Sequence, residues 1–307
     1  MGCTRFNGAA RCHSLSNTAG INWLLRKVLR LAPQREIPRF AATNFQQWAR
    51  KRGVPDCDGQ YGHASQDAAS DGRNVILWAD TFNNYFCPGT SQAAHQVLTD
   101  AAFNVQVSQK HLCCGRPLYD FGMLDRAKIY LKRILEALAP QIDAGIPIVV
   151  LEPSCASVFR DELANLFSGD LRANRLRRQT FLLSEFLAKD KGYQPPRLSK
   201  KVLLHGHCHH KSIMKMKDEE ALLCKMGVEL KTLDSGCCGM AGPFGFEKDK
   251  YVVSQAVGER VLFPAVRQAE PDTFVLTDGF SCREQIFQAT GRRAVHLAEL
   301  LQIARRQ

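Results

Sequence analysis

Apolar runs and amphipathic segments alternate from residue 73 to the end of the chain. Residues 75–79 and 146–151 are short runs rich in Val, Ile and Leu, as is typical of strands buried on both faces of a parallel sheet. Between them, residues 92–103 and 124–139 place apolar side chains at helical spacing. The pattern predicts strands of a parallel sheet joined by helical crossovers, the organisation of an α/β fold.

The same order of elements recurs in the second half of the chain. The recurring elements are strands at residues 201–205, 228–233 and 273–277 and helices at residues 219–226 and 248–268. Residues 181–187 and 295–301, which end the two halves, also resemble each other. We therefore predict an internal duplication that forms two tandem Rossmann-like parallel-sheet lobes, at residues 73–195 and 196–307.

Residues 1–72 lack this alternation. They show helical apolar spacing around residues 21–31 and 45–53, followed by a Gly- and Ser-rich linker. Residues 1–56 hold ten Arg or Lys and two Asp or Glu, so most of the net charge of +11 lies there. We predict a basic, partly helical N-terminal segment that docks on an acidic partner or anionic lipid, or that is simply solvated. No motif indicates a nucleic-acid partner.

The chain shows no apolar run of the roughly 20 residues needed to cross a bilayer, and its N-terminus lacks the features of a signal peptide. We therefore expect no transmembrane segment and a cytoplasmic location, with the inner face of the membrane as the alternative. In a reducing compartment, the 12 cysteines indicate metal or redox chemistry rather than a disulfide framework.

Eight of the cysteines fall into two equivalent sets. Each set has a Cys-Cys-Gly element, flanked on both sides by a cysteine that follows a predicted strand. The first set is Cys87, Cys113, Cys114 and Cys155, and the second is Cys208, Cys237, Cys238 and Cys282. Because ligands gather beyond the carboxyl ends of parallel strands, each set is expected to converge at the rim of its own sheet.

Four convergent thiolates can hold an iron-sulfur cluster or a zinc ion, or can form a pair of redox disulfides. Zinc usually takes cysteines from Cys-x2–4-Cys pairs, whereas adjacent cysteines point in different directions and suit a polynuclear cluster better. The spacing therefore favours a 4Fe-4S cluster, with zinc as the alternative. Gly115 and Gly239 are candidate cofactor-binding residues, because glycine tolerates positive φ and lets backbone amides approach sulfur; the alternative is that they only mark turns.

Four histidines surround Cys208 in the segment His205-Gly-His207-Cys208-His209-His210. An imidazole there could replace a cysteine as a ligand, donate a proton near a reducible centre, or only orient a neighbouring side chain. His207 and His209 are the candidate cofactor-binding residues among them.

The motifs around these cysteines resemble those of a known family. The duplicated pattern resembles the cysteine-rich CCG domain pair found in one subunit of heterodisulfide reductase and in the iron-sulfur subunits of glycolate oxidase, lactate-utilisation and anaerobic glycerol-3-phosphate dehydrogenase systems. Glu152-Pro-Ser-Cys155, His205-Gly-His-Cys208-His and Gly236-Cys-Cys-Gly-Met-Ala-Gly242-Pro-Phe-Gly-Phe-Glu247 look most like the C-terminal iron-sulfur region of FAD-containing D-2-hydroxyacid dehydrogenases, of the D-2-hydroxyglutarate or D-lactate type. The resemblance covers about residues 18–307.

The resemblance implies an iron-sulfur electron-transfer component of a flavin-dependent 2-hydroxyacid dehydrogenase or a related oxidoreductase. FAD is expected only on a partner chain, because the FAD domains and the ferredoxin motif of the large enzymes are absent from this sequence. The implied partners are an FAD-binding dehydrogenase subunit and a ferredoxin-like iron-sulfur protein, with a quinone or a cytochrome as acceptor. Val158 and Gln285 stand where heterodisulfide reductase has a further cysteine, which favours a simpler site in each repeat.

Two other functions stay open at this point. A zinc-binding structural or interaction module would use the metal to fix the two lobes and the basic segment to recruit a partner. A detached C-terminal fragment without independent activity would also lack the flavin and ferredoxin parts.

Overall fold

The computed structural model describes residues 28–57 and 73–307. The helix predicted around residues 21–31 and the linker predicted at residues 54–72 lie largely outside this range. Within it, the helix predicted at residues 45–53 is present as α3 (Phe45–Lys51), which begins at a capping box formed by Asn44 and Gln47.

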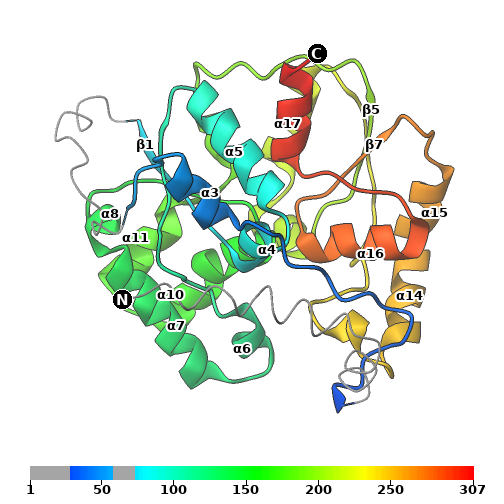
Figure 1. Ribbon diagram of the computed structural model, residues 1–307, viewed down its shortest axis with the longest axis horizontal. Helices are drawn as coiled ribbons and strands as arrows, with labels where there is room; N and C mark the ends of the chain where they lie inside the picture. Colours follow the sequence, from blue (N-terminus) through cyan, green and yellow to red (C-terminus); the bar gives the residue numbers. More distant parts are fainter. Residues whose placement is uncertain (1–27, 58–72) are drawn as a thin grey trace.

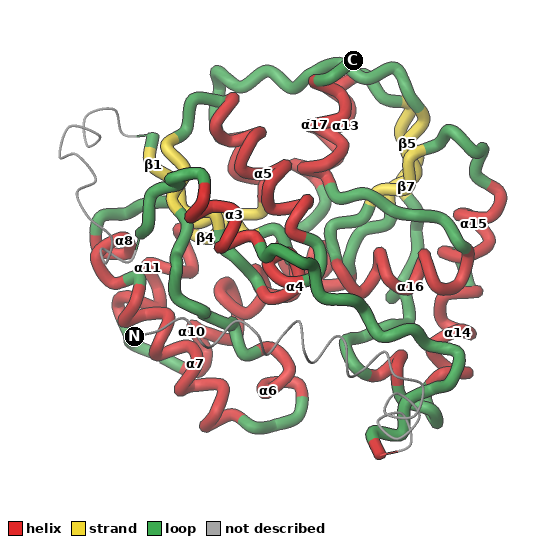
Figure 2. Tube along the Cα trace, in the orientation of Figure 1, coloured by secondary structure: helices red, strands yellow, loops and turns green. Residues whose placement is uncertain are grey.

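Two parallel sheets stand side by side, as Figure 2 shows by the two separate groups of strands. The first has the order β2-β1-β3-β4 and contains β1 (Asn74–Leu77), β2 (Asn104–Gln106), β3 (Ile148–Val150) and β4 (Thr180–Leu182). The second has the order β6-β5-β7 and contains β5 (Lys201–Leu204), β6 (Glu229–Thr232) and β7 (Phe274–Leu276). The predicted α/β class with two parallel-sheet lobes is confirmed.

Helical segments connect the strands of each sheet. In the first lobe they are α4 (Thr81–Tyr85), α5 (Pro88–Asp100), α6 (Arg116–Asp120), α7 (Leu124–Ala137), α8 (Ala139–Asp143), α9 (Pro153–Ser157), the π-helix η2 (Val158–Glu162), α10 (Leu163–Leu166), α11 (Leu171–Gln179) and α12 (Leu183–Lys189). In the second lobe they are the π-helix η3 (His210–Met214), α13 (Lys217–Met226), η4 (Phe244–Phe246), α14 (Tyr251–Glu259), α15 (Leu262–Gln268), α16 (Phe280–Thr290) and α17 (Leu297–Arg305). None of the described helices is both long enough and apolar enough to cross a membrane.

The two lobes repeat each other down to their last elements. In the first lobe β4 pairs with β3 and leads into α12, and in the second lobe a single bridge between Leu276 and Val295 takes the place of this strand pair before α17. The likeness between residues 181–187 and 295–301 therefore reflects equivalent positions in the two lobes.

The single helix predicted at residues 248–268 is instead two helices, α14 and α15, and this prediction was wrong. Pro264 lies in the first turn of α15. Proline has no backbone N–H, and its ring collides with the carbonyl group one turn earlier, so the helix cannot continue through it. The break falls at Val261, whose φ is −146°.

Each lobe packs its last helix against the first long helix of the other lobe. α17 packs against α5, and α12 packs against α13; Figure 1 shows α17 beside α5 between the two sheets. The buried side chains form a core shared by both lobes, which includes Leu77 of β1, Leu204 of β5 and Leu301 of α17. Burial of apolar area on this scale is the main force that holds the lobes together.

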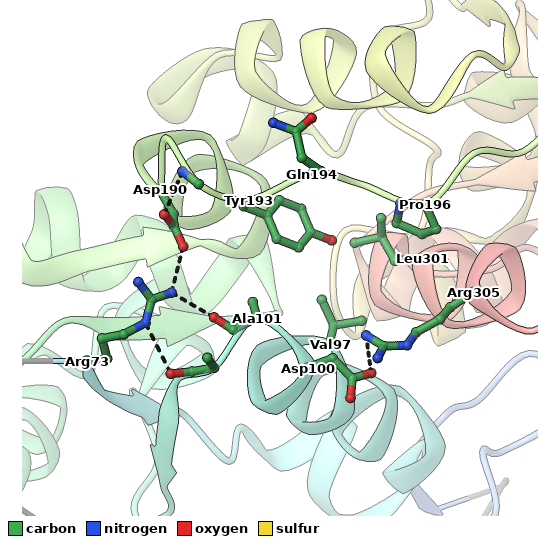
Figure 3. Close-up of a pocket in the computed structure, with 12 residues that line it drawn as sticks. Arg73, Val97, Asp100, Ala101, Asp190, Tyr193, Gln194, Pro196, Leu301 and Arg305 are labelled. Atoms are coloured by element: carbon green, nitrogen blue, oxygen red, sulfur yellow. Dashed lines mark hydrogen bonds and ion pairs between the residues drawn. The ribbon is translucent and has the colours of Figure 1, made fainter. Parts of the chain in front are cut away.

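Two ion pairs lie at the amino ends of the strands, one between the lobes and one within the first lobe (Figure 3). Arg305 of α17 lies 2.6 Å from Asp100 of α5 and joins the lobes, whereas Arg73, just before β1, lies 2.7 Å from Asp190 of the same lobe. The four side chains line a cavity of about 610 Å³ whose lining contains no cysteine.

Asp80 is buried at the N-terminus of α4, where its Oδ1 accepts hydrogen bonds from the backbone amides of Phe82 and Asn83, at 3.0 and 2.9 Å. Burial, followed by the negative charge of Glu152, raises the pKa of Asp80 to about 7, although the hydrogen bonds from Asn83 oppose the shift. The folded chain therefore holds a proton on Asp80 more tightly than the unfolded chain does. The resulting stability is fully present below the unfolded pKa of 3.8 and is lost as the pH rises through about 7.

Asp80→Asn keeps an acceptor oxygen but cannot ionise, so the variant should lose this pH dependence. As the pH rises from about 4 to about 7, the free energy of unfolding of the variant should increase relative to that of the wild type by on the order of 3 kcal/mol. Urea unfolding at a series of pH values measures the difference. Parallel curves for the two proteins would show that Asp80 is not the group that titrates.

Candidate metal centre

Seven of the eight predicted cysteines line one cavity of about 550 Å³ between the lobes: Cys113, Cys114, Cys155, Cys208, Cys237, Cys238 and Cys282. Each follows the carboxyl end of a strand, which is where the side chains of parallel sheets present ligands. The sequence predicted each set at the rim of its own sheet and did not predict how the two rims lie relative to each other. The exchanged packing of α12 and α17 turns both carboxyl edges toward the same space, so the two sets face each other.

The thiols of the second set form a connected set of neighbours. Cys237 acts on the pKa values of Cys208 and Cys238, and Cys238 acts on that of Cys282. Cys238 and Cys282 are buried, whereas Cys208 and Cys237 are partly exposed toward the cavity. Four sulfur atoms from three different loops are thereby within reach of a common ligand.

The neighbouring thiols shift one another's pKa values in opposite directions. The neighbouring Cys237 and then burial raise the pKa of Cys208, and the neighbouring Cys237 and Cys282 raise that of Cys238. The pKa of Cys237 is lowered, first by Cys208, and that of Cys282 is lowered, first by Cys238. Metal ligands must be thiolates, so a bound metal ion would displace the remaining thiol protons.

The first set contains three cysteines at the cavity. The Sγ atoms of Cys114 and Cys155 lie 3.0 Å apart, and the pKa of Cys113 is raised, first by its hydrogen bond with Cys114 and then by burial. The contact with Cys114 lowers the pKa of Cys155, but burial and then the charges of Asp80 and Glu152 outweigh it and raise this pKa to about 11. Acidic neighbours therefore oppose thiolate at Cys155, whereas a neighbouring cysteine is the first cause of the lowered pKa values of Cys237 and Cys282.

In the first lobe, Thr81 stands at the position that corresponds to Cys208 of the second lobe. It lies four residues after the end of β1, as Cys208 lies four residues after the end of β5. Its hydroxyl donates a hydrogen bond to Cys113 Sγ at 3.7 Å. The two sets are therefore inequivalent, with three thiols and a hydroxyl in one lobe and four thiols in the other.

Cys87 does not line the cavity, so its expected convergence with Cys113, Cys114 and Cys155 is not met. It precedes α5, and the charges of Arg283, Glu284 and Glu299 of the second lobe act on its thiol. Burial raises its pKa, with the Arg283 charge opposing. Its separation from β1 explains the difference: Cys87 lies ten residues after Leu77, far enough for the whole of α4 to come between them.

Both predicted glycines have the backbone conformation expected of them. The φ angles of Gly115 and Gly239 are 76° and 91°. The Gly239 amide donates to Cys237 Sγ at 3.3 Å, and the Gly115 amide donates to the Cys113 thiol. A Cβ atom on Gly239 would collide with the carbonyl oxygen of Ser254, so no larger residue fits. The amides that approach sulfur are a means by which a protein sets the potential of a cluster.

His207 and His209 both line the cavity, with ring centroids 5.2 Å apart. His209 Nε2 lies 2.8 Å from Arg116 of the first lobe. Burial, then the charge of Arg116, lowers the pKa of His209 to about 4, so the ring is neutral and Nε2 accepts this hydrogen bond. His205, whose Nδ1 contacts Ser235 Oγ at 2.7 Å, places a ring nitrogen within 4.8 Å of Cys238 and Cys282.

Several side chains at the site were not predicted. Arg116 contacts Glu162 as well as His209 and so joins the two lobes at the cavity. Gln285 Nε2 donates to the Cys238 carbonyl oxygen at 3.0 Å, and buried Arg35 donates to the Gly245 carbonyl oxygen at 2.7 Å, so both fix the second Cys-Cys-Gly loop. Comparing the two first strands would have found Thr81, but no pattern in the sequence marks the others.

The residues at the second set fit an iron-sulfur cluster. Four neighbouring thiols lie together with two backbone amides directed at sulfur, and the buried His205 Nε2 beside Cys238 and Cys282 has no hydrogen-bond partner among the described residues. Thiolate ligands suit iron-sulfur clusters, and adjacent cysteines suit a polynuclear group. The first set offers one thiol fewer.

Comparison with known proteins agrees with this arrangement. The profile of the cysteine-rich domain (CCG) matches residues 80–160 and 202–287. A subunit of the anaerobic glycerol-3-phosphate dehydrogenase of Escherichia coli is 30% identical over 287 residues, which are 92% of this chain and 68% of that protein. Lactate utilization protein A of Anoxybacillus flavithermus is 26% identical over 74% of this chain and 98% of its own length.

A third relative is much longer than this chain. The D-2-hydroxyglutarate dehydrogenase of Pseudomonas putida is 28% identical over 240 residues, which are 76% of this chain and 23% of that enzyme. The resemblance inferred from the cysteine motifs is confirmed. The chain belongs to the cysteine-rich domain (CCG) family and carries two copies of the domain, one in each lobe.

Proposed function

We propose that the protein is the iron-sulfur electron-transfer component of a flavin-dependent 2-hydroxyacid dehydrogenase or a related oxidoreductase. The observation that carries the proposal is the gathering of seven thiols from both lobes at one cavity, four of them in a connected set. Cys208, Cys237, Cys238 and Cys282 would hold a 4Fe-4S cluster, which when bound supplies one-electron transfer. The similarity to dehydrogenases and their subunits in other organisms supports an oxidoreductase role.

The relatives suggest which partners the chain has. FAD and the substrate hydroxyacid would be bound by a partner dehydrogenase subunit, and a ferredoxin-like protein would pass the electrons from the flavin to this chain. The Escherichia coli relative is itself one subunit of a dehydrogenase, and this similarity supports assembly with other chains.

The cavity wall favours a small apolar acceptor over a protein. Phe82, Phe121 and Phe244 line it, and the Phe82 ring stacks on Phe280 with centroids 4.5 Å apart. Arg116 is the cationic side chain of the described lining and could donate to a carbonyl oxygen of such a molecule. A quinone matches this combination of an aromatic wall and one donor.

Cys237→Ser should remove most of the iron, because it breaks the centre of the connected set. Iron and acid-labile sulfide per chain, with EPR of the reduced protein after anaerobic purification, measure the loss. Cys87→Ser and Cys224→Ser should retain wild-type iron, since Cys87 lies off the cavity and Cys224 is exposed on α13. An iron-free wild type that is fully occupied by zinc, or loss of iron in Cys87→Ser, would refute the assignment.

Gly239→Ala should weaken both the fold and the cluster site, because the new Cβ atom would meet the Ser254 carbonyl oxygen. Gly242→Ala is the matched control: its φ of 61° is also positive, but no atom lies within 4 Å of the new Cβ. We expect the control to lose about 1 kcal/mol from backbone strain alone and to keep its iron, whereas Gly239→Ala loses several-fold more stability and most of its iron. Equal effects in the two variants, by thermal unfolding and iron content, would contradict this role of the loop.

A further inference from the structure

A second group of possible metal ligands lies inside the second lobe, apart from the cavity. His210, Glu219 and Asp278 are 1%, 1% and 4% exposed, and one ligand atom from each lies within 4.8 Å of the others. They come from three different segments: the start of η3, the first turn of α13, and the loop after β7. None of the three lines the cavity with the thiols.

Several atoms of this group have no hydrogen-bond partner among the described residues. They are Nδ1 and Nε2 of His210 and Oε1 of Glu219. The closest approach is between His210 Nδ1 and Glu219 Oε2, at 3.2 Å. One proton shared between these two side chains would satisfy only one ring nitrogen, and a buried polar atom without a partner costs about 1–3 kcal/mol. The pattern indicates a missing ligand rather than a complete hydrogen-bond network.

The charges of the group are also unbalanced. Glu219 and Asp278 bring two buried carboxyl groups, and the nearby cationic side chains are directed elsewhere. Arg160 contacts Glu185 at 2.6 Å, and Arg283 donates to the Asp278 backbone carbonyl, at 2.6 Å, rather than to its carboxylate. Buried carboxylates without a counter-charge are costly, and a divalent cation would neutralise both.

Asp278 is held in place by partners that do not compete for a metal. Its Oδ1 accepts from the Leu297 amide at 3.0 Å and lies 3.3 Å from His296 Nε2. His296 Nδ1 accepts from the Ala298 amide, so the ring proton is on Nε2, which donates to the Leu151 carbonyl oxygen at 3.1 Å and lies beside the Asp278 carboxylate without offering a ligand. Such outer contacts are typical of carboxylates that bind metal ions.

We propose that His210, Glu219 and Asp278 bind one divalent cation of the Mn²⁺, Fe²⁺ or Zn²⁺ class. One imidazole and two carboxylates form a nitrogen and oxygen donor set, which suits these ions. The cation braces the cluster site, because His210 follows Cys208 by two residues and Asp278 precedes Cys282 by four. It ties the two loops that carry these cysteines to α13.

Mn²⁺ alone is the probe, because it favours carboxylates and has little affinity for thiolates. Added to the full chain treated with a chelator, it should bind one ion per chain, measured by the decrease in the EPR signal of free Mn²⁺. Glu219→Gln should weaken binding by at least about tenfold, whereas the adjacent Glu220→Gln, whose carboxylate accepts from Thr232, should bind as the wild type does. Mn²⁺ should raise the unfolding temperature of the wild type and of Glu220→Gln only.

His210→Asn is the second variant, for the case in which Glu219→Gln does not fold, and it should also lose the ion. Cys237→Ser should keep it, which separates this site from the thiols and makes the result independent of the iron content. Failure of the wild type to bind Mn²⁺, unchanged binding in both Glu219→Gln and His210→Asn, or loss of binding in Cys237→Ser would each overturn the proposal.

Discussion

The packing of each lobe's last helix on the other lobe's first long helix is the constraint on which the thiol site depends. α17 lies on α5 and α12 on α13, and Thr90 of α5 donates to Glu299 of α17 at 2.7 Å. Because the core beneath these helices is shared, the lobes cannot turn relative to each other without exposing apolar side chains. The carboxyl edges of the two sheets, and the loops that carry the cysteines, are thereby held face to face.

The duplicated lobes present different chemistry to the space they share. The second lobe offers four thiols beside His205 and His207, whereas the first offers three thiols beside Asp80 and Glu152, with Thr81 where the fourth would be. Carboxylates oppose thiolate, and the fourth thiol of the second lobe completes a ligand set that the first lobe lacks. Equal folds therefore do not imply equal sites, and the second lobe is the better candidate for a bound cluster.

Much of the fold could be predicted because the strands are short continuous apolar runs and the helices are amphipathic, and because both patterns occur twice. The cysteines could be placed at the strand ends for the same reason. The sequence could not predict that both sets line a single cavity. Nothing in the sequence of α12 or α17 indicates which of the two lobes their apolar faces cover. We matched Cys87 to Cys208 because both are cysteines. The residue that lies as far beyond β1 as Cys208 lies beyond β5 is Thr81. Arg116 gave no signal, since its contacts join segments far apart in the chain, and Gln285 was noted only as standing in place of a cysteine, not for its contact with the Cys238 carbonyl oxygen.

The most direct test is a crystal structure of the anaerobically purified protein, with anomalous difference maps recorded at the iron and zinc absorption edges. We predict a compact iron peak bounded by Cys208, Cys237, Cys238 and Cys282, opening on the cavity that the first lobe's thiols also line. A zinc peak at that position without iron, or iron coordinated by Cys87, would contradict this prediction.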